Sequence, residues 1–277
     1  MSIKKQIYWE KSEEDILSNN FSNSSREKLE NLLPKRTWKS IRRKAERMSM
    51  KRLDYFRSLR PKNHHFFKKW SEEMAYILGF ITADGNINKT RNSYYLQFCL
   101  QKKDEDILKK MRKMLAPKNK FSYYKPENTL SFKLGSTTIY KDLLKLGITA
   151  NKTFSVKPPK IPKAYLRHYL RGFFDGDGCI NLFKRKDAKK IFPSVSIVSN
   201  MSMISFLNKI FNKITGSRLK PYKTLSKYKN PMGTLKYTCN NAYKILDFLY
   251  KDSTIYLNRK NKLYQHVKET MHYANCK

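Results

Sequence analysis

Apolar residues recur with helical spacing in the first fifty residues of the chain. Residues 12–17 and 25–33 predict two short helices, the first opened by Ser12 and the second ended by Pro34. A third helix is predicted to begin after Thr37 as its N-cap. Its apolar positions recur every three or four residues and form one face, made of Trp38, Ile41, Ala45 and Met48. The pattern predicts a small three-helix unit.

From residue 71 onward the pattern changes and repeats itself. An apolar helical segment, residues 76–83 in the first copy and 169–176 in the second, precedes alternating positions that are typical of β-strands. Matched segments follow in each copy: strands at 95–100 and 194–198, helices at 106–115 and 203–214, strands at 129–132 and 234–237, and helices opening at Tyr140 and Tyr243. Each copy reads helix, strand, strand, helix, strand, strand, helix. We therefore expect an α+β fold of two pseudo-symmetric units.

Composition adds a strong charge to this picture. The 277 residues carry a formal net charge of +37, while 40% are hydrophobic and 13% aromatic, which argues against a disordered polycation. Residues 1–34 have a balance of −1 and residues 35–70 a balance of +12. Such an excess indicates a polyanionic partner, with nucleic acid preferred over an anionic membrane surface.

Several protein classes are not expected. The chain contains no run of 18 apolar residues, so no membrane-spanning helix is expected. Its N-terminus has no apolar signal-peptide core. The cysteines Cys99, Cys179, Cys239 and Cys276 are scattered without a CxxC pair, which disfavours structural zinc and disulfides. We expect reduced thiols and a cytoplasmic location, in a prokaryotic or phage-infected host cell, with an organelle as the alternative.

The third predicted helix carries a basic face opposite its apolar face. That face consists of Lys39, Arg42, Arg43 and Arg47. A three-helix unit with a cationic third helix is typical of helix-turn-helix DNA readers, although a solvated basic face is the simpler alternative. The segment also resembles Myb/SANT-like helix-turn-helix domains through Trp9-Glu10, Leu32-Leu33-Pro34 and Arg36-Thr37-Trp38. We predict four regions: a DNA-binding domain at 1–52, a basic linker at 53–70, and repeat units at 71–158 and 159–277.

Both apolar helices of the repeat end in Asp-Gly. Glycines 79 and 172, aspartates 84 and 177, and glycines 85 and 178 all match at an offset of 93 residues. Small residues four apart on one helix face allow two helices to approach closely, which would bring Asp84 and Asp177 together. Two adjacent carboxylates repel each other unless a cation lies between them, and Mg²⁺ or Mn²⁺ suits such oxygen ligands. Metal ions held there could promote attack of water on a phosphodiester.

The runs ILGFITADG (77–85) and LRGFFDGDG (170–178) resemble the signature of the LAGLIDADG homing endonucleases. The resemblance implies two αββαββα units whose sheets form a saddle over double-stranded DNA. It implies that the last acid of each motif, Asp84 and Asp177, holds the metal, with lower-ranked backbone ligands at Gly85 and Gly178. It also implies a catalytic lysine in each unit, for which the candidates are Lys152 and Lys260.

The two motifs differ from each other and from the family pattern. The earlier acid of the second motif is Asp175, but the first motif has Thr82 at that position. Arg171 in the second motif stands where a small residue is usual, and Leu78 is large at the matching position. If either faces the partner helix, the helix packing must differ.

Alternation along the predicted strands separates buried from outward residues. Leu96, Phe98 and Leu100, and likewise Val195 and Ile197, are predicted to be buried. The outward candidates for contact with bases and phosphates are Tyr95, Gln97, Lys133, Lys184, Arg185, Lys186, Ser194, Ser196 and Lys236. Two unequal halves predict an asymmetric DNA target.

The repeat, the basic charge and this resemblance together imply a monomeric, free-standing homing endonuclease that makes metal-dependent double-strand breaks without a protein partner. The alternative is a catalytically silent protein on the same scaffold, either an RNA maturase or a transcription regulator. A nicking enzyme is a third hypothesis, because Thr82 or a missing lysine could disable one half.

Overall fold

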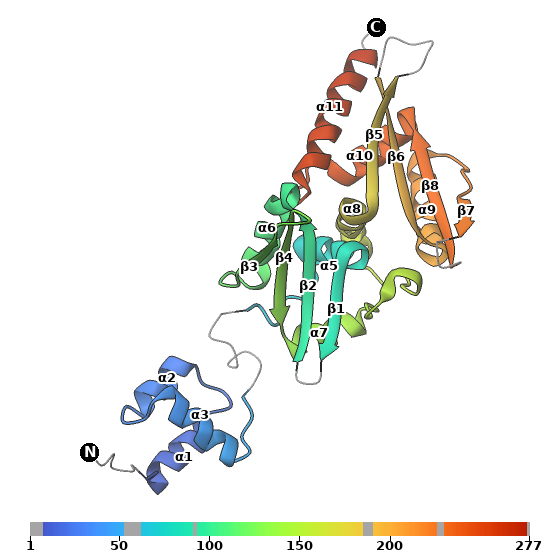
Figure 1. Ribbon diagram of the computed structural model, residues 1–277. Coiled ribbons are helices and arrows are strands. Elements are labelled where there is room, and N and C mark those ends of the chain that lie inside the picture. The colour runs from blue at the N-terminus through green and yellow to red at the C-terminus, as the bar shows by residue number, and fades with distance from the viewer. Residues whose placement is uncertain (1–7, 53–61, 91–92, 185–190, 226–229, 276–277) are drawn as a thin grey trace. The chain divides into compact units, whose positions relative to one another are not determined.

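The computed structural model describes residues 8–52, 62–90, 93–184, 191–225 and 230–275, and it divides into two units, Met1–His64 and His65–Lys277 (Figure 1). The candidate DNA contacts Arg185 and Lys186 lie outside the described residues, as do residues 53–61, half of the predicted linker. In the parts described, no helix is both long enough and apolar enough to cross a membrane.

The smaller unit contains α1 (Lys11–Asn20), α2 (Arg26–Leu32) and α3 (Trp38–Arg47), as the periodicity predicts. Their apolar faces meet in one core of Leu17, Phe21, Leu29, Leu33, Ile41 and Ala45. The prediction that Ser12 opens the first helix is wrong, because Glu10 is the N-cap. The backbone N–H of Glu10 donates to the Glu13 carboxylate over 3.0 Å, which fixes the helix start two residues earlier.

The larger unit has the predicted order of elements in both halves. The first half contains α5 (Glu72–Asp84), β1 (Gly85–Thr90), β2 (Ser93–Gln101), α6 (Glu105–Leu115), β3 (Phe121–Tyr124), β4 (Thr129–Gly135) and α7 (Thr137–Lys145). The second half contains α8 (Leu166–Asp177), β5 (Gly178–Lys184), β6 (Ile191–Asn200), α9 (Met201–Thr215), β7 (Tyr222–Leu225), β8 (Pro231–Thr238) and α10 (Cys239–Tyr250). A further helix, α11 (Asn258–Asn275), was not predicted.

Each half forms one antiparallel sheet of four strands, in the orders β1-β2-β4-β3 and β5-β6-β8-β7. Helices α5 and α8 lie side by side between the two sheets, with α5 contacting β1 and β2 and α8 contacting β5 and β6 (Figure 1). The apolar residues of both halves form one continuous core. The α+β architecture with two αββαββα units is confirmed.

Strand alternation places the predicted residues in this core. Leu96, Phe98 and Leu100 of β2 are buried, and so are Val195 and Ile197 of β6. Ser194 lies on the face of β6 opposite Val195, as predicted, but the prediction that it is accessible to DNA is wrong, because this side chain is only 5% exposed. Ser194 is small and lies on a central strand between the larger Asn181 and Thr238, its register partners on either side, so its neighbours cover it.

The closest approach of α5 and α8 occurs at their matched glycines. A Cβ atom on Gly79 would overlap the carbonyl oxygen of Tyr169, and one on Gly172 would overlap the carbonyl oxygen of Tyr76. These two contacts are related by the 93-residue offset of the repeat, so the helix pair is pseudo-twofold symmetric. The prediction that small residues allow the backbones to touch is confirmed.

Candidate active site

The two motif helices end at Asp84 and Asp177, directly before the glycines that begin β1 and β5. A Cβ atom on Gly176, next to Asp177, would lie 3.5 Å from a carboxylate oxygen of Asp84, so the two helix ends adjoin. Both aspartates reach solvent although protein surrounds them on most sides. The two acids therefore lie together where the motif helices meet the surface.

Burial and the proximity of the two carboxylates dominate the electrostatics of the pair. Burial raises the pKa of Asp177 to about 7, and the nearby Asp84 carboxylate contributes to this rise, against the opposing effect of Lys152 and Lys260. Burial also raises the pKa of Asp84, while the same two lysines lower it. Crowded carboxylates with raised pKa values are favourable positions for a cation, which would stabilise their charged forms.

Lys152 and Lys260, the two lysine candidates, occupy matching positions beside the acids. The Lys152 ammonium donates to the carbonyl oxygen of Gly85. The Lys260 ammonium donates to the matching carbonyl of Gly178, and also to the carbonyls of Phe174 over 2.6 Å and Asp175 over 2.9 Å. Lys260 therefore caps the carbonyl end of α8, as cations near a helix C-terminus do.

Both lysines are buried, and burial lowers the pKa of each, that of Lys260 to about 8. The carboxylates of Asp84 and Asp177 oppose this effect on Lys152. The site thus combines two acids that are less acidic than usual with two lysines that are less basic than usual. Such opposed shifts are typical of sites that move protons or bind charged groups.

The residues present fit a hard divalent cation. Two carboxylates meet at the helix ends, and Mg²⁺ characteristically takes one or two protein carboxylates and completes its shell with water and substrate phosphate. The described residues contain no group of three or more His, Cys, Asp or Glu side chains that could enclose a metal by themselves. The carbonyls of Gly85 and Gly178 already accept hydrogen bonds from lysines. Their use as ligands stays a prediction that this arrangement does not favour.

The earlier acid of the second motif, Asp175, is buried and its carboxylate is hydrogen-bonded within the protein. It is 1% exposed and accepts hydrogen bonds from the hydroxyl groups of Tyr76 and Tyr250 and from the backbone N–H of Leu257. At the matching point of the first motif, Thr82 accepts a bond from the Tyr169 hydroxyl over 3.2 Å. The hydroxyl of Thr82 and the carboxylate of Asp175 thus each accept a hydrogen bond from the matching tyrosine of the opposite motif helix.

Arg171 is fully buried, and the carbon of its guanidinium lies 5.5 Å from the ring centroid of Tyr76 on the partner helix α5. Its guanidinium donates to the carbonyl oxygens of Ile255 over 2.7 Å and Leu249 over 3.1 Å. It therefore secures the turn that leads from α10 to α11 and to Lys260. Sequence reasoning missed this role, for which the signal was an arginine among the apolar residues of the second motif.

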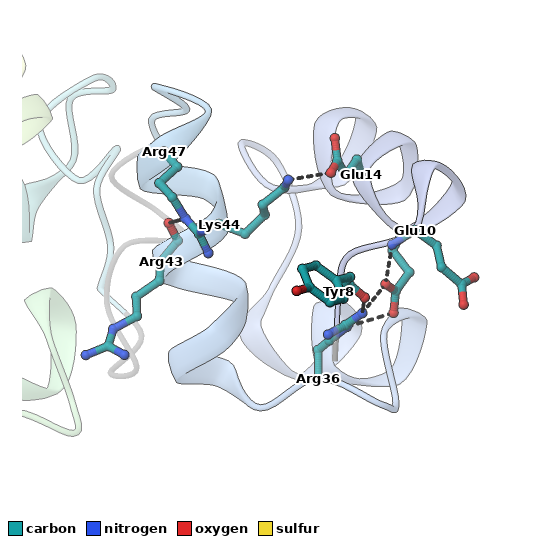
Figure 2. Close-up of polar contacts among 8 residues, drawn as sticks. Tyr8, Glu10, Glu14, Arg36, Arg43, Lys44 and Arg47 are labelled. Atoms are coloured by element: carbon teal, nitrogen blue, oxygen red, sulfur yellow. Dashed lines mark hydrogen bonds and ion pairs between the residues drawn. The ribbon is translucent and has the colours of Figure 1, made fainter. Parts of the chain in front are cut away.

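The basic residues of the smaller unit separate into two groups. Arg36 pairs with Glu13 and Lys44 pairs with Glu14, so these two cations link α3 and the residues before it to α1 (Figure 2). Figure 2 shows Arg43 pointing away from the α1 side that Lys44 reaches. The predicted DNA contacts on α3 are all exposed, namely Lys39, Arg42, Arg43 and Arg47. This exposed group is accessible to an anionic partner.

The outward faces of the two sheets carry polar candidates in matching positions. Gln97 on β2 lies in register with Lys133 on β4, and Ser196 on β6 lies in register with Lys236 on β8. The Lys133 ammonium also lies 3.5 Å from the ring centroid of Tyr95. Gln97 and Ser196 are partly exposed and the two lysines exposed, as is Lys184 at the end of β5. The structure places all of them on the surface, unlike Ser194.

The ionisation of Asp177 gives a direct test of the coupled acids. Because its pKa is about 7, Asp177 should titrate near neutral pH in the metal-free protein, as followed by carbon NMR of its carboxyl group. Asp84→Asn should lower this pKa but leave it above the usual range, since burial is the larger cause. Between the usual pKa and pH 7 the folded state holds the extra proton, so Asp177 makes the protein less stable as pH rises. Unchanged titration in Asp84→Asn would show that the carboxylates are not coupled.

Comparison with known proteins supports this description. The model of the family described as LAGLIDADG endonuclease matches residues 170–271. The solved structure of the meganuclease I-CpaMI bound to uncleaved DNA has a TM-score of 0.51 and 14% identity, covering 73% of this chain and 90% of that chain. The homing endonuclease I-LtrWI bound to target DNA has a TM-score of 0.48 and 16% identity, covering 78% and 92%. No curated protein sequence matches significantly. The family resemblance and the fold are confirmed.

Proposed function

We propose that this chain, a two-motif LAGLIDADG protein, is a site-specific endonuclease that hydrolyses both strands of double-stranded DNA with Mg²⁺ or Mn²⁺. The observation that carries the proposal is the meeting of Asp84 and Asp177 at the ends of two helices in direct backbone contact. A site on the pseudo-twofold axis between two sheets is suited to two DNA strands of opposite polarity. Both motifs have this final acid, whereas they differ at Thr82 and Asp175.

The two aspartates and the two lysines of the site would have different roles. Asp84 and Asp177 would hold the divalent cation, which when bound supplies an activated water and stabilises the leaving oxygen of the phosphodiester. Lys152 and Lys260 keep positive charge beside the carboxylates and so favour their ionised forms. The same ammonium groups lie where they offset charge on a phosphate that approaches the acids. Burial of the two lysines strengthens this electrostatic effect.

DNA binding would combine the two sheet faces with α3. Lysines such as Lys133 and Lys236 are suited to phosphates, while Gln97 and Ser196 are suited to base edges. The two halves present different side chains at matching positions, so the target would be long and asymmetric. Both halves lie on one chain, so a monomer would suffice.

Cleavage of a randomised duplex library tests the proposal. With Mg²⁺ we expect double-strand cuts at one long asymmetric sequence, and with EDTA no cuts. A parallel binding selection in Ca²⁺ reports affinity without relying on cleavage. Enrichment of a long asymmetric site without cuts in Mg²⁺ or Mn²⁺ would replace the endonuclease proposal with a catalytically silent DNA-binding protein. Absence of DNA enrichment would favour the RNA maturase alternative.

Removing the smaller unit should weaken the salt dependence of binding. Because Phe67 and Trp70 pack into the larger unit, the deletion should end at His64. The deletion removes the contacts of four basic α3 side chains with DNA phosphates. The slope of the logarithm of the DNA-binding constant against the logarithm of the salt concentration should therefore fall by up to about 4. Fluorescence anisotropy over a salt series measures this slope.

A smaller change separates the basic face of α3 from the rest of the domain. Arg42→Gln with Arg43→Gln should reduce the same slope by about 2, because two cations are removed. Lys28→Gln on α2 removes an exposed charge elsewhere and serves as the matched control. An unchanged slope in the double variant would exclude phosphate contact by these two arginines.

A further inference from the structure

Each half of the larger unit holds the lysine-bearing segment of the other half. Lys152 belongs to the first half and Lys260 to the second, and each ammonium serves the motif glycine of its own half. The backbone that carries each lysine, however, is bonded to the opposite half. In both cases the residue of the opposite half that makes this bond lies where a central strand, β2 or β6, leads into the next helix, α6 or α9.

Asp104 provides the contact from the first half. This residue ends the 3-10 turn after β2, and its side chain is 9% exposed. Its carboxylate accepts a hydrogen bond from the Arg259 guanidinium over 2.8 Å, and Arg259 directly precedes Lys260. The neighbouring Asp106 accepts a bond from the backbone N–H of Asn258 over 3.3 Å. Two carboxylates of the first half therefore bind the start of α11.

Asn200 provides the matching contact from the second half. It ends β6 and is 4% exposed. Its side-chain amide N–H group donates to the carbonyl oxygen of Val156 over 3.1 Å, while its side-chain oxygen accepts the N–H of Met203 and caps α9. Val156 in turn closes the turn at Lys152, since its N–H donates to the Lys152 carbonyl over 2.8 Å. The second half thus holds the turn that bears Lys152.

The two contacts are related by the repeat but differ in chemistry. One is an ion pair between Asp104 and Arg259, and the other is a neutral amide bond from Asn200 to a backbone carbonyl. We propose that Asp104 and Asn200 are positioning residues that place the lysine of the opposite half, Asp104 acting on Lys260 and Asn200 acting on Lys152. The expected effect on DNA cleavage rests on the proposed endonuclease function. The expected effect on the placement of the two lysines rests on the contacts alone.

The proposal has a strand-specific consequence. If each lysine serves one cleavage event, Asp104→Ala should slow cutting of one DNA strand about tenfold, the effect expected for loss of a hydrogen bond to a charged group. Asn200→Ser should slow cutting of the other strand, since serine still caps α9 but cannot reach Val156. Single-turnover cleavage of a duplex labelled on each strand measures both rates. The two variants should accumulate nicks in opposite strands.

Amide hydrogen exchange provides a readout that needs neither metal nor cleavage. Asn200→Ser should speed exchange at Ser155 and Val156 and leave Lys260 and Asn261 unchanged, and Asp104→Ala should do the reverse. Arg259→Gln is a second variant on the Asp104 side, and it should reproduce the Asp104→Ala pattern. Glu105→Gln, which removes ion pairs with Lys102 and Lys109 within the first half, is the matched control and should change neither segment.

The outcomes separate the inference from the proposed function. The crossed exchange pattern in a protein that does not cut DNA would uphold the inference and overturn the endonuclease. A wild-type protein that cuts both strands, with variants that slow the two strands equally, would overturn the inference. Exchange that rises only within the half that carries the substitution would overturn it as well.

Discussion

Asp84→Asn and Asp177→Asn should each reduce the rate of DNA cleavage at least about 1000-fold, because a metal site contributes several kcal/mol to a transition state and each 1.36 kcal/mol is worth about tenfold. Each substitution removes one of the two carboxylates that meet at the helix ends. An amide preserves the shape of the side chain but is a far weaker ligand for a hard cation. DNA affinity should stay the same or rise, since a negative charge facing phosphate is lost.

Single-turnover cleavage and equilibrium binding to the selected target measure the two effects separately. Asp252→Asn is the matched control, since Asp252 is exposed and has a φ of 54°, a conformation that asparagine adopts readily. The control should cut at the wild-type rate. A variant at Asp84 or Asp177 that also cuts at that rate would refute the assignment of these residues as metal ligands.

Local patterns in the sequence were sufficient to predict the repeated elements and the meeting of the two motif acids. The offset of 93 residues matched Gly79 with Gly172 and Asp84 with Asp177, and the small residues on each helix face then predicted their meeting. Strand alternation correctly placed Phe98 in the core. Such features depend on spacing along the chain, which can be counted.

Contacts between distant residues could not be predicted in the same way. The carboxylate of Asp175 is satisfied by Tyr76 and Tyr250, which lie 99 and 75 positions away along the chain. Helix α11 buries Lys260 together with Tyr264 and Val267, and the contact of this lysine with the carbonyl end of α8 does not follow from the apolar positions of α11. The burial of Ser194 depends on neighbours from two other strands. Such features require the assembled fold, because no spacing along the chain encodes them.

Gly79→Ala and Gly172→Ala should each destabilise the larger unit by about 3 kcal/mol or more, the upper range for forcing extra atoms into a packed interior. The added methyl group would overlap a backbone carbonyl oxygen of the opposite helix, and it would lie 2.8 Å from Phe173 N at Gly79 and 3.0 Å from Phe80 N at Gly172. Backbone atoms cannot rotate away as a flexible side chain can. The helices must therefore separate, and the separation also moves Asp84 away from Asp177.

Urea unfolding followed by fluorescence measures the loss of stability, and cleavage of the selected target measures the displacement of the acids. Gly135→Ala is the matched control, because its added methyl group would lie at an ordinary 3.6 Å from the Tyr94 carbonyl oxygen. The control should unfold at nearly the wild-type urea concentration. Since both glycines belong to one pseudo-symmetric contact, the double variant should be less destabilised than the sum of the single variants, because helices that one methyl group has already separated leave room for the second. Wild-type stability in either single variant would show that the helix backbones are not in contact at these glycines, and the argument that brings the two carboxylates together would then fail with it.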